Sequence, residues 1–140
     1  MTTTATRQEA TVEQLMTVEL VSVTVDTPLA EVAELLERHH ISGLPVLGPD
    51  GGLAGVISQT DLLRARAVED LWASWPGLRA RHLMSHPALT VRPETPIDEA
   101  ARLMEDHGVH RLVVVAAGTH RPVGILSVSD LLHSMAARHG

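Results

Sequence analysis

At 140 residues and 44% hydrophobic content, the chain is long enough for one compact domain or two tightly joined halves, and without Phe or Tyr its core must be aliphatic. The absence of Cys excludes disulfides, thiolate metal ligands and a cysteine nucleophile, and the absence of Lys excludes Schiff-base chemistry. A formal net charge of −6 argues against broad electrostatic binding to nucleic acid or to an anionic membrane.

The chain opens with a tail, a strand and a helix. Residues 1–10 are polar and Thr-rich, and we expect them to form a flexible tail. Alternating β-branched residues at 21–25 predict a short strand. Thr27-Pro28 then predicts a helix start, with proline at the first helical position. The helix has one apolar face, formed by Leu29, Val32, Ala33 and Leu36.

Two strands and a closing helix complete the first half. The strands are predicted at 44–47 and 53–58, on either side of a turn rich in Gly and Pro, and the helix begins near Asp61. A linker or connecting helix follows and carries Trp72 and Trp75. Two interpretations of these tryptophans stay open. They cover the seam between the two halves, or they form an exposed aromatic surface for a partner.

The second half repeats the first. A helix with the same apolar spacing is predicted over 97–104, strands over 112–116 and 123–127, and a closing helix from near Asp130. Short motifs recur in the same order, although the second copy has gained one residue. Leu15-Met16-Thr17 returns as Leu83-Met84-Ser85, and Ser58-Gln59-Thr60-Asp61 returns as Ser127-Val128-Ser129-Asp130.

This duplication predicts the fold class. A unit of roughly 55 residues is too small to bury a good core alone, so the two copies should form one pseudo-symmetric domain. We predict an α+β fold of two tandem β-α-β-β-α repeats related by pseudo-two-fold symmetry, with small mixed sheets packed against helices. The predicted boundaries are the tail 1–10, repeat one 11–66, the linker or connecting helix 67–81, and repeat two 82–140.

The repeated Ser-x-Ser/Thr-Asp motif predicts a ligand site. Its residues form a first acceptor set, Ser58, Thr60 and Asp61, and a second acceptor set, Ser127, Ser129 and Asp130. An ionised Asp can accept hydrogen bonds from both hydroxyls of a ribose, and the amides of a helix N-terminus favour a phosphate. Gly55 and Gly124 would let a ligand approach the backbone. The competing interpretation is that Ser and Asp only cap the helix, and both roles can coexist.

The order, spacing and duplication of these motifs resemble the cystathionine-β-synthase (CBS) domain family, from about Val12 to Met135. The segments Ile41–Val46 and Val109–Val114 add to this resemblance. It implies that the two repeats form one module, which binds adenine nucleotides or related adenosyl ligands in clefts between the copies. It also implies that modules pair into flat dimers and regulate an attached or separate protein.

The resemblance also implies crossed sites, in which the acceptor set of one repeat serves a cleft lined by the other. One site would combine the first acceptor set with Leu89, Val109, His110 and Arg111. The other would combine the second acceptor set with Val21, Ile41, Ser42 and Gly43, and we add Thr17 to the ligand-binding residues. His110-Arg111 resembles a phosphate grip of the family, whereas the first repeat has Ser42-Gly43 there. The competing interpretation of Arg111 is a solvated charge at the strand edge.

The sequence predicts neither a metal site nor a catalytic one. His107 and His110 straddle Gly108 at a helix end, which breaks helical i, i+3 ligand spacing, and neither they nor His39 and His40 have a Cys nearby. The serines lack a nucleophile-elbow pattern. No apolar run approaches the ~20 residues of a membrane-spanning helix, and no signal-peptide core is visible. We therefore expect a cytoplasmic, non-enzymatic protein without an obligatory cofactor, and its all-Arg basic residues indicate a GC-rich bacterial genome.

These observations predict a stand-alone regulatory module that senses AMP, ADP or ATP and passes a conformational change to a separate, unidentified effector protein by population shift. We expect a homodimer, because the aliphatic helix faces at 29–36 and 97–104 exceed what one thin module can cover. The alternatives are a ligand-free dimerisation scaffold and a module for another adenosyl ligand, such as S-adenosylmethionine or NAD. An enzyme acting on nucleotides is disfavoured by the lack of a catalytic constellation.

Overall fold

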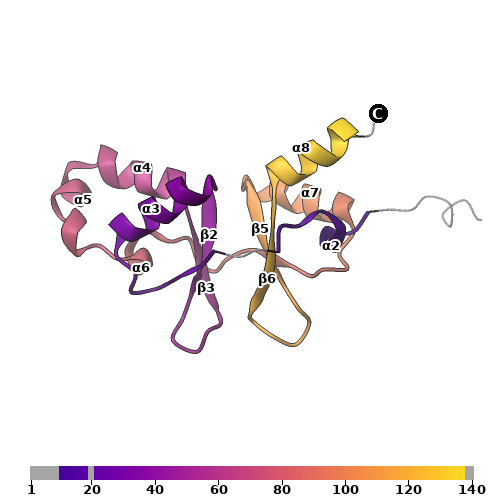
Figure 1. The fold of residues 1–140 in the computed structure, drawn as a ribbon, viewed down its shortest axis with the longest axis horizontal. Helices are drawn as coiled ribbons and strands as arrows, with labels where there is room; N and C mark the ends of the chain where they lie inside the picture. Colours follow the sequence, from indigo (N-terminus) through magenta and orange to yellow (C-terminus); the bar gives the residue numbers. More distant parts are fainter. Residues whose placement is uncertain (1–9, 19–20, 138–140) are drawn as a thin grey trace, which may run out of the picture. The chain divides into compact units, whose positions relative to one another are not determined.

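The structure is a computed structural model that describes residues 10–18 and 21–137. It divides into two compact units, and each is described here by itself. The first unit comprises Leu20–Ala88, and the second unit comprises Met1–Glu19 together with Leu89–Gly140 (Figure 1).

The first unit is a three-stranded sheet with its helices on one face (Figure 1). Strand β1 pairs in parallel with β2, and β2 pairs antiparallel with β3. The elements are β1 (Val23–Thr24), α3 (Leu29–His39), β2 (Gly43–Leu47), β3 (Leu53–Ser58), α4 (Gln59–Ala67), α5 (Glu69–Ala73), a 3₁₀ turn (Trp75–Gly77) and α6 (Ala80–Leu83).

The second unit has the same topology. Its sheet has the order β4-β5-β6, again with one parallel and one antiparallel pair, and both sheets carry an irregularity at the same place, between Val46 and Leu47 and between Val114 and Val115. Its elements are α2 (Val12–Leu15), β4 (Thr90–Val91), α7 (Ile97–His107), β5 (Arg111–Val115), β6 (Pro122–Ser127) and α8 (Val128–Ala137). The predicted α+β fold with two β-α-β-β-α repeats and small mixed sheets is confirmed.

The helices after β1 and β4 start one residue later than the sequence predicts. Pro28 and Pro96 are extended N-cap residues rather than first helical residues. The preceding threonines use their hydroxyls in the turn instead, since Thr27 Oγ1 accepts a hydrogen bond from the Thr24 amide at 3.0 Å and Thr95 Oγ1 accepts one from Arg92 at 3.1 Å. Proline's fixed φ suits this extended cap position as well as the first helical turn.

Each unit has its own aliphatic core, as the composition predicts. Leu29, Val32 and Leu36 of α3 are buried against the sheet β1–β3. Ala100 and Met104 of α7 are buried in the equivalent core of the second unit. Both faces are therefore largely covered within their own units, so they leave less surface for a dimer than the sequence suggests. The bulky apolar residues that remain exposed in the described ranges lie elsewhere, and they include Leu63 on α4 and Leu132 and Met135 on α8.

The opening segments of the two repeats are exchanged between the units. In the second unit, the Val12 amide donates to the Thr95 carbonyl at 2.8 Å and Thr17 forms an antiparallel bridge with Ile125. In the first unit, the Ala80 amide donates to the Thr27 carbonyl at 2.8 Å and Ser85 bridges to Val56. The compact units therefore do not follow the sequence repeats 11–66 and 82–140, because each set of strands packs with the other repeat's opening motif.

The two tryptophans both belong to the first unit. Trp75 is half-buried and packs on the first core, whereas Trp72 is exposed. Their rings lie 5.4 Å apart, and the Arg66 guanidinium lies 4.5 Å from the Trp72 ring centre. Trp75 therefore packs on the aliphatic core of the first unit, and Trp72 lies between Trp75 and Arg66 on the exposed side.

Candidate functional site

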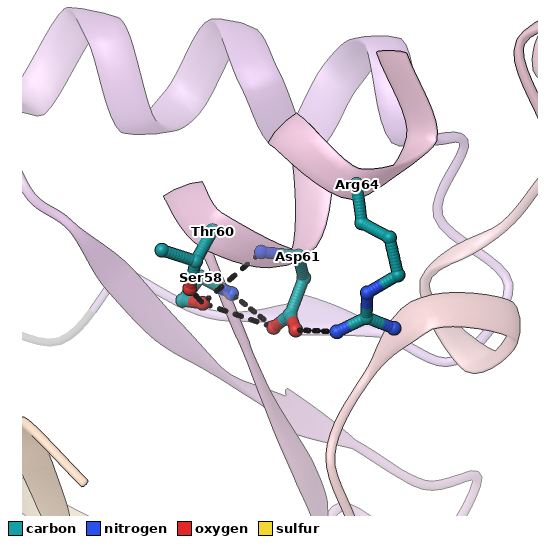
Figure 2. A network of polar contacts seen from close by, with 4 residues as sticks. All are labelled: Ser58, Thr60, Asp61 and Arg64. Atoms are coloured by element: carbon teal, nitrogen blue, oxygen red, sulfur yellow. Dashed lines mark hydrogen bonds and ion pairs between the residues drawn. The ribbon is translucent and has the colours of Figure 1, made fainter. Parts of the chain in front are cut away.

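The first acceptor set lies where β3 ends at Ser58 and α4 begins at Gln59 (Figure 2). The Ser58 amide donates to Asp61 Oδ2 at 2.8 Å, and the Ser58 hydroxyl donates to the same oxygen at 3.0 Å. That hydroxyl also accepts from the Asp61 amide at 3.4 Å and lies 2.8 Å from Thr60 Oγ1. A serine hydroxyl has one proton, so Thr60 must be the donor in the last contact. The carboxylate is thereby fixed in one orientation.

The second acceptor set has the same geometry between β6 and α8. The Ser127 amide donates to Asp130 Oδ2 at 2.8 Å, and its hydroxyl donates to that oxygen at 3.1 Å. The Asp130 amide donates back to the Ser127 hydroxyl at 3.2 Å. The capping interpretation of both motifs is confirmed, since each Asp is the N3 partner of a capping box. This capping role alone accounts for the Asp at both positions, so ligand binding at these sets stays a prediction.

The two sets differ in what surrounds the second carboxylate oxygen. Asp61 is buried, and its Oδ1 accepts a hydrogen bond from Arg64 at 3.0 Å (Figure 2). Asp130 is half-buried, and His133 stands where the first repeat has Arg64. Across residues 10–18 and 21–137, nothing donates a hydrogen bond to Asp130 Oδ1. The sequence offered a signal for this difference, since Asp61 and Arg64 have helical i, i+3 spacing.

Gly55 and Gly124 are explained by the chain itself rather than by a ligand. A Cβ atom at Gly55 would lie 2.6 Å from the Ser85 carbonyl oxygen. A Cβ atom at Gly124 would lie 2.6 Å from Met16 Sδ and 3.1 Å from the Thr17 carbonyl oxygen. Each glycine therefore gives space to the Leu-Met-Ser/Thr opening motif that bridges to its strand, which corrects the expectation that a ligand approaches the backbone there.

The residue pairs before the central strands lie beside the acceptor sets of their own units. Gly43 is paired with Ser58 across the sheet, and the Gln59 amide donates to the Ser42 carbonyl at 2.9 Å. In the same way Arg111 is paired with Ser127, and the Val128 amide donates to the His110 carbonyl at 3.0 Å. In each unit, the residue pair at the start of the central strand is thus hydrogen-bonded to the start of the closing helix.

The other predicted site residues lie close to these strand and helix starts or to the cores. Val21 and Ile41 are half-buried against the first core, and Leu89 and Val109 against the second. Thr17 is exposed beside its bridge to Ile125. The two crossed ligand sets, each of which takes residues from both units, stay predictions.

The histidines do not gather into a metal site in the described part of the chain. Among residues 10–18 and 21–137, no group of three or more His, Asp or Glu side chains could hold a metal ion. His107 instead contacts its own helix, with Nδ1 3.0 Å from the Leu103 carbonyl oxygen. Over the same residues, no helix is long and apolar enough to cross a membrane.

Sequence reasoning missed the cavities of the second unit, one of which lies between α7 and α8. It has a volume of about 350 Å³ and an apolar lining, and His110 stands at its edge. The lining residues are Ala101, Met104, Glu105, Gly108, Val109, His110, Val128 and Leu131. The apolar spacing of α7 indicated a core face but not that part of this face stays open beside α8.

Comparison with known proteins gives relatives of similar length and similar fold. A CBS domain-containing protein of Dictyostelium discoideum is 31% identical over 128 residues, which cover 86% of this chain and 88% of the relative. The crystal structure of CBSX2 in complex with AMP matches with a TM-score of 0.79 and 31% identity, over 93% of this chain and 98% of that one. CBSX2 is a protein of Arabidopsis thaliana. The CBS domain pair of protein MJ0100, in complex with 5′-methylthioadenosine and S-adenosyl-L-methionine, matches with a TM-score of 0.83 over 93% of this chain and 98% of that one, and its 22% identity shows the fold alone.

Other relatives are enzymes, among them homoserine O-acetyltransferases and inosine-5′-monophosphate dehydrogenases of archaea and bacteria. The chain matches only 21% to 25% of their length. A model of the CBS domain matches residues 12–68 and again residues 80–137, which together take in both acceptor sets. The predicted resemblance is thereby confirmed, and the chain belongs to the CBS domain family, of which it carries two copies in tandem.

Proposed function

We propose that the chain is a regulatory module that binds an adenine nucleotide and uses its two acceptor sets to hold the ribose. One observation carries this proposal. Asp61 is an ionisable side chain that is only 6% exposed, yet it is held in one orientation by the amide and hydroxyl of Ser58. A carboxylate that is fixed at the end of a strand is suited to a vicinal diol, since it can accept hydrogen bonds from the hydroxyls without turning.

Relatives support an adenosyl ligand. CBSX2, 31% identical to this chain, is known in complex with AMP, and the more distant MJ0100 pair in complex with 5′-methylthioadenosine and S-adenosyl-L-methionine. The second unit also offers the means to recognise a phosphate, because His110 and Arg111 stand beside the helix cap at Ser127. A planar guanidinium binds phosphate through two parallel hydrogen bonds. We therefore place AMP, ADP and ATP ahead of S-adenosylmethionine and NAD.

The ligand would act by population shift. A nucleotide that binds one arrangement of the protein more tightly than another moves the equilibrium by its difference in affinity. An effector protein that binds only one arrangement would then respond to the nucleotide. On this proposal the module itself performs no catalytic step.

We also propose that the chain associates into a homodimer. The apolar residues that support this are not the helix faces that the sequence suggested. Leu63 of α4 is 65% exposed, and Leu132 and Met135 of α8 are 58% and 61% exposed. Leu63 and Leu132 occupy equivalent positions in the two repeats, so a two-fold arrangement of chains could cover both. Light scattering at micromolar concentration should report a dimer, and a monomer with and without nucleotide would count against it.

A thermal-shift panel with AMP, ADP, ATP, S-adenosylmethionine and NAD tests the ligand class. We expect AMP, ADP or ATP to raise the unfolding temperature in a concentration-dependent way, because a ligand that binds only the native state stabilises it. Stabilisation by S-adenosylmethionine or NAD alone would move the proposal to another adenosyl ligand. No stabilisation by any of the five would favour a ligand-free scaffold, and turnover of nucleotide by the purified protein would favour an enzyme.

A further inference from the structure

The ion pair between Arg64 and Asp61 occupies an oxygen that the proposed ligand needs. Arg64 Nη2 lies 3.0 Å from Asp61 Oδ1, and the Arg64 side chain is 56% exposed whereas that of Asp61 is 8% exposed. Figure 2 shows the guanidinium beside the carboxylate, on the side away from Ser58. The pair therefore joins a solvent-facing cation to the buried anion of the first acceptor set.

A count of hydrogen bonds shows how this affects a ribose. Asp61 Oδ2 already accepts from the amide and hydroxyl of Ser58, which fills its two acceptor positions, and Arg64 takes one of the two on Oδ1. A diol that donates two hydrogen bonds finds one position left. At Asp130 the bonds from Ser127 to Oδ2 are the same, and Oδ1 has no donor among the described residues. Both hydroxyls can bind there without displacing a protein group.

We propose that Arg64 is a specificity-determining residue that competes with ribose for Asp61, so that the first acceptor set binds an uncharged nucleoside more weakly than the second set does. This inference rests on the proposed function, because it needs the acceptor sets to hold ribose. Displacement of Arg64 costs little, since its half-exposed guanidinium returns to water. Both acceptor sets can therefore bind the nucleoside, and the first binds it with lower affinity than the second.

The sequence supplies a matched exchange to test this inference. Position 64 is Arg in the first repeat and position 133 is His in the second, so Arg64→His and His133→Arg each install the other repeat's residue. Asp130→Ala leaves the first set to be measured alone, and Asp61→Ala leaves the second. Adenosine is the probe, because it has the ribose but no phosphate for an arginine to attract. Calorimetry at about pH 8 keeps an introduced histidine neutral.

We expect Arg64→His to tighten adenosine binding at the first set by about twofold to fivefold at low salt, the range that corresponds to a modest ion pair with a half-exposed cation. His133→Arg should weaken binding at the second set by a similar factor. Salt gives a readout that a purely structural role would not produce. As ionic strength rises from about 0.01 M to about 1 M, screening should tighten adenosine binding at the first set of the Arg64 protein and leave the Arg64→His protein unchanged.

Each outcome decides between the inference and the function on which it rests. If adenosine and AMP bind but the exchanged residues change neither affinity nor salt dependence, the competition is overturned and ribose binding stands. If neither ligand binds the unsubstituted chain, the proposed function fails and the inference fails with it. Arg64→Gln is the second variant, since it removes the charge with a side chain of good helix propensity. Thermal unfolding establishes that each variant is folded before binding is measured.

Discussion

The two units share a backbone but differ in the side chains around it. Both have the strand order of one parallel and one antiparallel pair, with the sheet irregularity at the same place and a Ser-Asp capping box at the same strand end. In the first unit the carboxylate of that box is buried and paired with Arg64, whereas in the second it is half-buried, and the position equivalent to Arg64 is His133. The strand order and the helix cap are thus the same in both units, whereas the charged partner of the capping carboxylate is not.

On the proposed function, this difference predicts that the two acceptor sets bind a ribose unequally. If both sets hold a ribose, the one with the uncommitted oxygen should bind adenosine first, and the other should respond at higher adenosine concentration. A module with two graded sites reports a wider range of ligand concentration than two equal sites would.

Asp61→Ala and Asp130→Ala should have the largest effects. Each should weaken nucleotide binding at its own set by about 2–4 kcal/mol, since it removes charge-assisted hydrogen bonds to the ribose. Calorimetry with AMP on each single variant gives affinity and stoichiometry. Glu69→Ala, on the exposed start of α5, is a control that should bind as the parent does. Unchanged affinity and stoichiometry in both variants would remove ribose recognition from these residues.

Substitution of the two glycines that precede the acceptor sets should lower the free energy of unfolding by different amounts. Gly55→Ala places its Cβ 2.6 Å from a backbone oxygen, so the chain must move, and we expect a loss of about 3 kcal/mol in the free energy of unfolding. Gly124→Ala meets first the sulfur of Met16, a flexible side chain, and should cost about 1 kcal/mol. Urea unfolding measures both.

Gly77→Ala is the matched control, because a Cβ atom there has nothing within 4 Å. It should change the free energy of unfolding by less than about 0.5 kcal/mol. An equal loss for Gly55→Ala and Gly124→Ala would show that the opening motifs pack alike in both units.

Arg111→Ala tests whether phosphate recognition belongs to the second unit. It should weaken AMP binding by about 1.5–3 kcal/mol, the range for a hydrogen bond to a charged group, and change adenosine binding little. The loss should shrink as salt rises, because a partly exposed ion pair is screened. Calorimetry with both ligands at two salt concentrations is the measurement. A variant that binds AMP and adenosine as the parent does would make Arg111 a surface charge.

Most of the fold could be predicted from the sequence because the same pattern of strands and helices occurs in two repeats. Strand 53–58 is predicted with the bounds of β3, and strand 112–116 differs from β5 by one residue. The strand predicted at 21–25 forms only Val23–Thr24, since β1 pairs with β2 over two residues and the residues around it make no ladder. Periodicity finds apolar faces, but it cannot say how far a partner strand extends.

The exchange of opening segments could not be predicted for a physical reason. Leu15-Met16-Thr17 and Leu83-Met84-Ser85 are nearly the same motif, so each fits the space beside Gly55 and beside Gly124. Local sequence therefore does not decide which unit takes which motif. The ion pair at Arg64 is a different case, since its i, i+3 spacing from Asp61 was visible, and only the burial of the carboxylate shows that the pair bears on the site.

The smallest effects should come from the ends of α3 and α7, where the same left-handed cap is made by different residues. His40 has φ of 54° and Gly108 has φ of 62°, and a Cβ atom at Gly108 would have nothing within 4 Å. Gly108→Ala should thus cost about 1 kcal/mol through backbone strain alone. His40→Gly should stabilise by about half as much, because glycine relieves that strain but gains freedom in the unfolded chain. His40→Ala keeps a Cβ atom in the left-handed region and should leave stability close to that of the parent. Urea unfolding of the three variants distinguishes strain from a side-chain contact: if His40→Gly and His40→Ala shift stability equally, the imidazole rather than the backbone angle determines stability at this cap, and the two helix ends differ for a reason other than the one argued from φ.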